Sequence, residues 1–263
     1  MYLRPMQFSF HKYQATGNDF ILIDDRKLTF PSDDAAFIAR CCDRRFGIGA
    51  DGLILIQNTT EADFKMVYFN ADGKESSLCG NGARCTVAFA ALLGIIKNEA
   101  HFLAIDGLHT AKIEKDRVVL RMHDVDRINT LDHYYFLDTG SPHHVEMVED
   151  LAHFPVVTKG RQIREGAPYF EEGCNVNFVE QHGPSTFSIR TYERGVEDET
   201  LSCGTGATAV ALAMHHSGKS TAETITIRVE GGELTISFKQ SINGYTAIDL
   251  QGTANFVYRG EWS

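Results

Sequence analysis

The sequence has no apolar run long enough to cross a membrane. Its longest one, Val87–Ile96, falls well short of the roughly 20 residues that a spanning helix needs. No cluster of five basic residues occurs, and the 25 Lys and Arg are outnumbered by 35 Asp and Glu. The formal net charge of −10 opposes binding to a phosphate backbone. The first ten residues also lack the apolar segment of a secretory signal. We therefore expect a cytoplasmic protein that binds neither nucleic acid nor membranes.

Metal-binding motifs are also missing. The chain contains no C-x-x-C pair, no H-x-x-x-H pair and no H-E-x-x-H sequence, so the sequence gives little support to a zinc site. Because no secretory signal is present, we expect its six cysteines to be reduced thiols rather than disulfides. They are Cys41, Cys42, Cys79, Cys85, Cys174 and Cys203. We expect no bound metal, and each cysteine has to be considered separately.

The pattern of apolar residues predicts many short strands and few helices. Runs bounded by Gly, Asp and Asn predict strands at Phe20–Asp24, Leu53–Gln57, Phe64–Phe69, Val118–Met122, Phe187–Arg190, Ile225–Val229 and Leu234–Phe238. Three helices are predicted, at Asp33–Arg44, Ala83–Leu93 and Ala207–His216. The last two are rich in alanine and are followed by glycine. This mixture predicts a β-rich α+β fold with mixed α/β elements.

An internal repeat is the most informative feature of the sequence. The segments CGNGARCTVAFAALLG from Cys79 and CGTGATAVALAMHHSG from Cys203 each place a glycine fifteen positions after the cysteine. Upstream, Thr16-Gly17-Asn18 and Thr139-Gly140-Ser141 form a second pair of anchors. The distance from their glycines to the two cysteines is 62 and 63 residues, respectively. Matching order and spacing indicate two halves of similar fold.

The repeat predicts two pseudo-symmetric domains. The N-terminal repeat is placed at residues 1–127, completed by a C-terminal strand near 255–263, and the C-terminal repeat at 128–254. The polar segment Asp124–Asp132 is expected to connect them. Two copies related by a pseudo-twofold axis predict a cleft between the domains.

Each repeated cysteine stands where a helix is expected to begin. Backbone N–H groups at a helix N-terminus stabilise a thiolate and can bind an anion, and the neighbouring glycines let that anion approach closely. For a single copy, a buried cysteine beside a tight turn would be the simpler interpretation. Two retained copies instead favour function. Thiols facing each other across a planar carbon could remove a proton from one side and deliver one to the other, which would invert a stereocentre without a cofactor.

At these residues the chain resembles diaminopimelate epimerase. The segments that carry the resemblance are GNDFILID (Gly17–Asp24), FNADG (Phe69–Gly73), CGNGARC (Cys79–Cys85), NVNFV (Asn175–Val179) and YERG with ETLSCGTGA (Tyr192–Ala207). Their order and spacing agree with the family over nearly the whole chain. The resemblance implies two domains, each a barrel-like mixed sheet around a central helix, with the active site in the interdomain cleft. It also implies a homodimer.

The activity implied by the resemblance is two-base epimerisation of LL-2,6-diaminoheptanedioate to the meso form without pyridoxal phosphate or another cofactor. This reaction serves lysine and peptidoglycan precursor synthesis. Cys79 and Cys203 match the two acid–base thiols of the family. The positions that match substrate-binding residues are Asn18, Asn70, Gly80, Asn81, Asn175, Glu193, Arg194, Gly204 and Thr205. His143 and Ser141 match supporting positions, although many family members have asparagine in place of Ser141, and some have glutamine in place of Gly52.

Three other functions are compatible with parts of the sequence. A proline or hydroxyproline racemase of the same two-thiol superfamily would usually carry Ser-Pro before the second cysteine, whereas this chain has Leu201-Ser202. A hydrolase with one nucleophilic cysteine, paired with His143, would not need two equivalent thiols. A non-catalytic binding module would tolerate serine at both cysteines. The epimerase is the function that uses the whole repeat.

Overall fold

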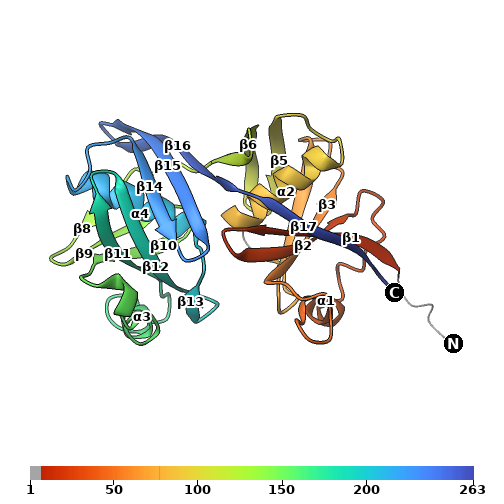
Figure 1. Cartoon of the computed structure of the whole chain (residues 1–263), viewed down its shortest axis with the longest axis horizontal. Coiled ribbons are helices and arrows are strands. Elements are labelled where there is room, and N and C mark those ends of the chain that lie inside the picture. The colour runs from red at the N-terminus through yellow and green to blue at the C-terminus, as the bar shows by residue number, and fades with distance from the viewer. Residues whose placement is uncertain (1–6, 77) are drawn as a thin grey trace. The chain divides into compact units, whose positions relative to one another are not determined.

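The computed structural model describes residues 7–76 and 78–263, which form a mostly β-sheet fold with four α-helices (Figure 1). This confirms the predicted mixed α+β class. The seven predicted strands are all present, most of them with one or more additional residues at their ends. Among the described helices, none combines the length and the apolar character needed to cross a bilayer.

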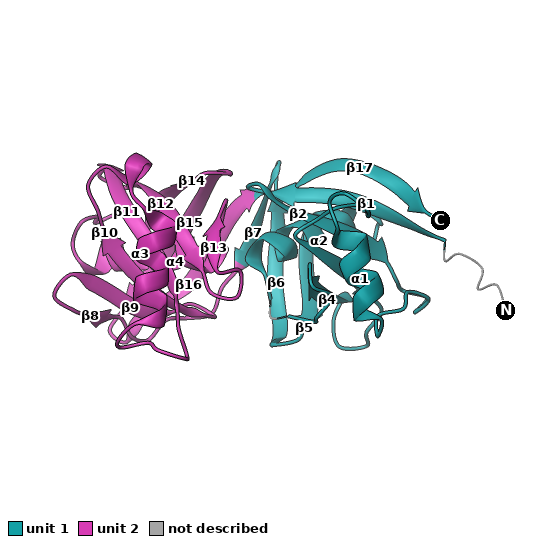
Figure 2. Ribbon diagram, turned by 90° about the horizontal axis from the view of Figure 1, so that it is seen from below, with its two compact units in different colours: residues 1–120, 253–263 teal, residues 121–252 magenta. Residues whose placement is uncertain are grey.

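The chain divides into two compact units (Figure 2). Unit 1 comprises the described residues up to Leu120 together with Thr253–Ser263, and unit 2 comprises Arg121–Gly252. The C-terminal strand β17 (Asn255–Trp262) belongs to unit 1 because it pairs antiparallel with β1 (Phe8–Ala15). The polar segment 124–132 lies within unit 2, where Val125 is buried and paired with Tyr245. It is therefore part of a folded unit rather than a free connector.

Unit 1 is built on a mixed sheet. The strands after β1 are β2 (Asn18–Asp24), β3 (Gly52–Gln57), β4 (Phe64–Asn70), β5 (Glu99–Ala104), β6 (Gly107–Glu114) and β7 (Arg117–Arg121). β1 pairs antiparallel with β2, β2 parallel with β3, β3 antiparallel with β4 and β4 parallel with β5. Antiparallel pairs then join β5 to β6 and β6 to β7.

Unit 2 repeats this order of pairings. Its strands are β8 (Asn129–Thr130), β9 (Tyr134–Asp138), β10 (Pro142–Met147), β11 (Asn175–Gly183), β12 (Thr186–Glu193), β13 (Asp198–Thr200), β14 (Thr224–Val229), β15 (Gly232–Ser241) and β16 (Gly244–Thr253). β9 pairs antiparallel with β10, β10 parallel with β11, β11 antiparallel with β12 and β12 parallel with β14. Antiparallel pairs then join β14 to β15 and β15 to β16, and β13 is an additional antiparallel partner of β12. The repeat seen in the sequence is thus present in the strand pairing of each unit.

A buried helix runs through each unit: α2 (Gly80–Leu92) in unit 1 and α4 (Gly204–His216) in unit 2. α2 packs against β1, β2, β3, β4 and β6, and α4 packs against six strands of unit 2 (Figure 1). Because strands approach each helix from several sides, nearly every position of the helix is buried, and alanine and glycine keep it thin enough to fit. Both helices begin three residues earlier than predicted, because the glycines after each cysteine lie inside the first turn.

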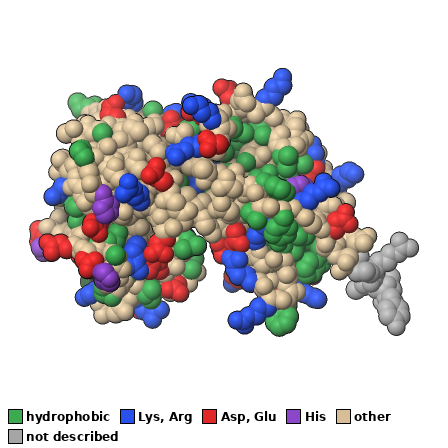
Figure 3. Space-filling view, viewed as in Figure 1, with side chains coloured by type: hydrophobic (Ala, Val, Ile, Leu, Met, Phe, Trp, Pro, Cys, Tyr) green, Lys and Arg blue, Asp and Glu red, His purple; other side chains and the backbone are tan. Residues whose placement is uncertain are grey.

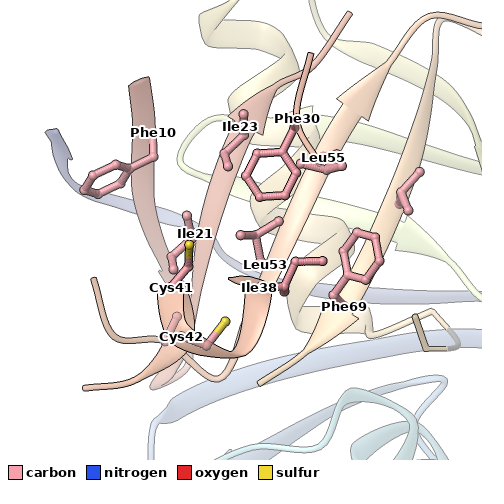
Figure 4. Close-up of a cluster of buried hydrophobic side chains, with 12 residues drawn as sticks. Phe10, Ile21, Ile23, Phe30, Ile38, Cys41, Cys42, Leu53, Leu55 and Phe69 are labelled. Atoms are coloured by element: carbon pink, nitrogen blue, oxygen red, sulfur yellow. The ribbon is translucent and has the colours of Figure 1, made fainter. Parts of the chain in front are cut away.

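The two other α-helices pack on the outside of the sheets. α1 (Ala35–Cys42) begins after Asp34, whose side chain accepts a hydrogen bond from the backbone N–H of Phe37. It covers an apolar core to which Cys41 and Cys42 belong (Figure 4). α3 (Val156–Glu165) was not predicted, because its sequence is mostly polar and only Val156 and Gly160 are buried. The four cysteines outside the repeat are all buried, Cys85 and Cys174 completely, so they are packing residues.

Candidate active site

In unit 1, the predicted substrate-binding asparagines lie at one end of the sheet. β2 and β3 are parallel and begin at Asn18 and Gly52, whereas β4 runs in the opposite direction and ends at Asn70. Gly52 is in register with both Phe20 and Asn70. Strand direction and register therefore bring Asn18 and Asn70 to the same edge.

In unit 2, the predicted site residues lie at the equivalent strand ends. β10 and β11 are parallel, and β10 begins just after Ser141 while β11 begins at Asn175. β12 runs antiparallel to β11 and ends at Glu193. His143 is in register with Asn175. Four residues predicted from the sequence thus gather at one edge of this sheet.

Cys79 and Cys203 are the N-cap residues of α2 and α4. The carbonyl of Cys79 accepts a hydrogen bond from Ala83 N–H at 2.7 Å, and that of Cys203 accepts one from Ala207 N–H at 2.9 Å. The backbone N–H groups of the intervening first-turn residues lack partners within the helix, which makes this end suited to an anion. The predicted amide donors Gly80, Asn81, Gly204 and Thr205 all lie in these first turns.

Two asparagine amides are linked by hydrogen bonds to the thiol of Cys79. Its sulfur lies 3.6 Å from Oδ1 of Asn18, in reach of a hydrogen bond donated by the thiol. The same oxygen accepts a hydrogen bond from Nδ2 of Asn81 at 3.2 Å. Nδ2 of Asn18 donates to the carboxylate of Asp51 at 2.7 Å. Both ends of the Asn18 amide are therefore held, with its oxygen toward the thiol.

The thiol of Cys203 has a different set of neighbours. Its sulfur accepts a hydrogen bond from the backbone N–H of Gly206 at 3.4 Å and lies 3.4 Å from the hydroxyl of Thr205. The Thr205 hydroxyl is in turn 3.3 Å from the hydroxyl of Ser141. Hydrogen bonds donated to sulfur stabilise a thiolate, so this surrounding suits an acid–base thiol.

Ser141 connects this chain of groups to His143. Oγ of Ser141 lies 3.0 Å from Nε2 of His143, and Nδ1 of His143 accepts a hydrogen bond from Nδ2 of Asn177 at 3.0 Å. The Asn177 amide is oriented by the carbonyl of His144, to which it donates at 2.9 Å, and by Thr191, from which it accepts at 2.9 Å. With Nδ1 as acceptor, the neutral ring carries its proton on Nε2 and donates it to Ser141.

His143 is fully buried, and burial together with the nearby cation Arg194 lowers its pKa to about 3. An unfolded chain would bind a proton at a pKa near 6.5, so the unfolded state takes up more protons between these two values. The stabilisation due to neutral His143 is complete above pH 6.5 and is lost as the pH falls toward 3. The loss can reach about 1.4 kcal/mol per pH unit.

We expect His143→Gln to flatten the decrease in unfolding free energy between pH 6 and pH 4. Urea unfolding at pH 7, 6, 5 and 4 measures this dependence, and His101→Gln, at an exposed histidine, serves as the control. Equal slopes for wild type and His143→Gln would show that His143 does not titrate as its burial requires.

Asn175 organises the neighbouring strand end. Its Oδ1 accepts a hydrogen bond from the backbone N–H of Arg194 at 2.9 Å, and its Nδ2 donates to Oγ of Ser141 at 3.1 Å. The guanidinium of Arg194 donates to the carbonyl of Glu172 at 2.9 Å. The carboxylate of Glu193 accepts a hydrogen bond from the Thr200 hydroxyl at 2.9 Å. Arg194 is exposed, so its remaining donors are open to a carboxylate ligand.

Three polar residues of these networks were missed in the sequence. Asp51 fixes Asn18, Asn177 fixes His143, and Arg84 donates to Oδ1 of Asn81 at 2.8 Å. Asn177 and Arg84 both stand inside motifs that were used for the resemblance. An arginine in the alanine-rich part of a buried helix was the signal available in the sequence, since such a charge requires partners.

The glycine at position 52 is explained by packing. A Cβ atom there would lie 2.6 Å from the carbonyl oxygen of Phe69 and 2.6 Å from the ring of Tyr68. The side chain of Tyr68 therefore occupies the space into which a residue 52 side chain would extend. This chain cannot place a glutamine at that position without moving Tyr68.

The comparisons with known proteins agree with one another. A family model described as diaminopimelate epimerase matches residues 10–128 and 135–257. A curated diaminopimelate epimerase from Flavobacterium psychrophilum is 57% identical over 249 residues, which cover 94% of this chain and 97% of the relative. Another, from Chlorobaculum tepidum, is 42% identical over 255 residues, covering 94% of this chain and 98% of that protein.

Solved structures share the fold at low sequence identity. A phenazine biosynthesis protein of the PhzF family from Bacillus anthracis has a TM-score of 0.79 at 14% identity, with 98% of this chain and 99% of that chain covered. A hydroxyproline epimerase from Agrobacterium vitis has a TM-score of 0.64 at 13% identity, with 97% and 92% covered. At this identity the likeness concerns the fold alone.

Proposed function

Because the chain belongs to the diaminopimelate epimerase family, it is an isomerase, and we propose that Cys79 and Cys203 are the two acid–base groups with which it interconverts LL- and meso-2,6-diaminoheptanedioate. One observation carries this proposal. The two units have the same strand pairing, and in each a cysteine caps the buried central helix beside the polar strand ends. A single nucleophilic thiol would give no reason for this duplication.

The proposed step moves two protons. A thiolate takes the proton from the α-carbon, and the electron pair of the broken C–H bond is delocalised into the adjacent carboxylate. The other thiol then gives its proton to the opposite face of the carbon, so the configuration is inverted. One thiol has become protonated and the other a thiolate, which readies the enzyme for the reverse direction. The chemistry requires the thiols to reach opposite faces of one carbon, and it involves no cofactor.

The helix N-termini supply the electrostatic part of the step. Removing an α-proton places negative charge on the carboxylate, and N–H groups in the first turns of α2 and α4 are suited to stabilise that charge. In this proposal the donors are provided by Gly80, Asn81, Gly204 and Thr205. Exclusion of water from the site would strengthen the interaction of these N–H donors with the carboxylate further.

The distal end of the substrate carries a second carboxylate and a second ammonium group. We assign the carboxylate to the exposed guanidinium of Arg194 and the ammonium group to the carboxylate of Glu193. The asparagines Asn18, Asn70 and Asn175 are assigned further contacts with the substrate. A planar guanidinium binds a carboxylate through two parallel hydrogen bonds. Proline and hydroxyproline have no such distal groups, so this pair favours diaminoheptanedioate over the racemase alternative.

The experiment that tests the function is exchange of the substrate α-proton in deuterated water, followed by proton NMR. We expect wild-type protein to incorporate deuterium into LL-2,6-diaminoheptanedioate and to form the meso isomer. Exchange with proline alone would assign the protein to the racemase alternative. Absence of exchange with both compounds would contradict two-base catalysis.

We further propose that the enzyme works in the cytoplasm. Its product is a precursor for lysine and peptidoglycan, and its two acid–base thiols have to stay reduced, which a reducing compartment ensures. The structure has all six cysteines as thiols rather than disulfides, and five of them are buried.

A homodimer is the oligomeric state we propose. Strand β17 exposes three consecutive apolar side chains, with Phe256, Val257 and Tyr258 each about half exposed. Hydrophobic side chains gather on the part of unit 1 where β1 and β17 lie (Figures 1 and 3). A second copy covering this surface would remove it from water.

We expect light scattering to give twice 29.3 kDa for wild type and a monomer for Val257→Lys. A monomeric wild type would contradict the proposal.

A further inference from the structure

Arg84 is a fully buried cation on the central helix of unit 1. Burial lowers its pKa to about 10, so the side chain remains charged at neutral pH. Within the described part of the chain, Arg84 forms no ion pair with a carboxylate. A buried charge without a counter-charge is costly, and an apolar residue of similar size would stabilise the helix better. A role beyond packing is therefore needed to account for it.

Over residues 7–76 and 78–263, the groups that accept hydrogen bonds from the guanidinium are all neutral. The shortest runs from Nη2 to Oδ1 of Asn81 at 2.8 Å. Longer ones, each 3.5 Å, reach the carbonyls of Gly80 and Thr253 and the hydroxyl of Thr16. With its oxygen held by Arg84, the Asn81 amide must present Nδ2 to Asn18. Arg84, acting through Asn81, and Asp51 therefore together set the orientation of Asn18 and of its oxygen beside the Cys79 thiol.

The other charged groups linked to this site compensate one another. Asp51, which holds Asn18, pairs with Arg44 at 2.7 Å, and Asp19 pairs with Arg44 at 2.7 Å and with Lys12 at 2.8 Å. This network contains two cations and two carboxylates. Two thiols, Cys79 and Cys85, also interact electrostatically with Arg84, and burial raises the pKa of Cys85 so that it stays neutral. Among the described residues linked to this site, Arg84 is thus the charge without a carboxylate partner, and it lies close enough to Cys79 for their charges to interact.

Unit 2 shows what the helix looks like without this arginine. The position equivalent to Arg84 is Thr208, whose hydroxyl donates to the carbonyl of Gly204 at 3.0 Å. The position equivalent to Asn81 is Thr205, which contacts the sulfur of Cys203 directly. A threonine therefore satisfies the fold at this point of the helix, and packing alone does not require arginine.

We propose that Arg84 is a positioning residue for Cys79. The guanidinium of Arg84 fixes Asn81, and through it Asn18, and it supplies the positive charge that a Cys79 thiolate faces. The inference rests on the acid–base role proposed above for Cys79. The proposal makes the surroundings of the two thiols different. The Cys79 thiol interacts with a buried cation and two amides, whereas the Cys203 thiol interacts with hydroxyl groups and a backbone N–H.

Two substitutions separate the parts of this role. Arg84→Gln keeps a hydrogen-bond donor for Asn81 but removes the positive charge, whereas Arg84→Lys keeps the positive charge but removes the planar guanidinium group. The first readout is the rate of Cys79 alkylation by iodoacetamide from pH 6 to pH 10, followed by peptide mass spectrometry. Cys203 in the same samples is the internal reference. The second readout is kcat and KM for epimerisation.

We expect Arg84→Gln to move the midpoint of the Cys79 profile upward by about one pH unit, since loss of a nearby opposite charge has an effect of this order. Arg84→Lys should leave that midpoint near the wild-type value. Both variants should lower kcat about 10-fold or more, because the thiol is displaced, and should raise KM as well, because Asn81 and Asn18 are also proposed to contact the substrate.

Thr86→Val is the matched control, because Thr86 lies on the same helix, is fully buried and donates only to the carbonyl of Gly82 at 2.8 Å. It should lower stability without changing the Cys79 profile or kcat. An unchanged Cys79 midpoint in Arg84→Gln, or an equal shift in Thr86→Val, would overturn the proposal. If Arg84→Gln does not fold, wild-type kcat in Arg84→Lys would overturn it. Alkylation is measured without substrate, so its outcome is independent of whether the wild type epimerises diaminoheptanedioate.

Discussion

Replacing either Cys79 or Cys203 by serine is expected to lower the rate of epimerisation by about 10³-fold or more. A serine hydroxyl is a far weaker acid than a thiol, so it can neither hold a negative charge near neutral pH nor deliver a proton as readily. Loss of either group breaks the two-proton step. Formation of the meso isomer from LL-2,6-diaminoheptanedioate, followed by NMR in deuterated water, measures the effect.

A buried cysteine outside the repeat provides the control. Burial raises the pKa of Cys41 to about 11, so this thiol is protonated at neutral pH. Cys41 belongs to the apolar core under α1, and Cys41→Ala should lower stability while leaving the rate per folded molecule unchanged. Wild-type turnover in Cys79→Ser or in Cys203→Ser would remove that thiol from the mechanism and reopen the single-thiol hydrolase.

Gly206→Ala is expected to have the second largest effect. A Cβ atom at this position would lie 2.4 Å from Oδ1 of Asn177 and 3.3 Å from the sulfur of Cys203. Asn177 cannot move aside without losing its hydrogen bonds to Thr191 and His143. We expect a loss of about 3 kcal/mol in unfolding free energy from overpacking. The rate should fall roughly 100-fold, because the groups around Cys203 are displaced.

The repeat offers a matched partner for this substitution. Gly82 occupies the equivalent position in α2, where a Cβ atom would meet the ends of the Ile54, Phe20 and Met66 side chains at 3.0 to 3.5 Å. The flexible ends of Ile54 and Met66 can shift, and alanine is favoured over glycine in a helix by about 1 kcal/mol. Gly82→Ala should therefore stay within about 1 kcal/mol of wild type in urea unfolding. Equal effects of Gly82→Ala and Gly206→Ala on stability and kcat would contradict the geometry at Asn177.

Much of the fold could be predicted because it depends on local patterns. Alternating apolar runs gave the strands β2, β3, β4, β7, β12, β14 and β15, and alanine-rich segments gave the two central helices. The predicted starts of those helices were late, since glycine after a cysteine is as typical of a turn as of a first helical turn. Helix α3 was missed because its apolar residues are too few to give a helical period.

What the sequence by itself determined is the duplication and the chemistry that goes with it: two cysteines, each at the start of a small-residue helix, and the family to which the chain belongs. Tertiary structure decided the surroundings of each thiol. Asp51 reaches Asn18 through the parallel pairing of β2 with β3, and Asn177 reaches His143 through the pairing of β10 with β11. Such contacts join residues about 30 positions apart, and no local pattern encodes which polar side chains meet after strands align. Arg84 and Asn81 are only three positions apart, but the complete burial of the Arg84 charge beside Asn81 depends on the strands that pack around α2, and tertiary structure therefore decided its role.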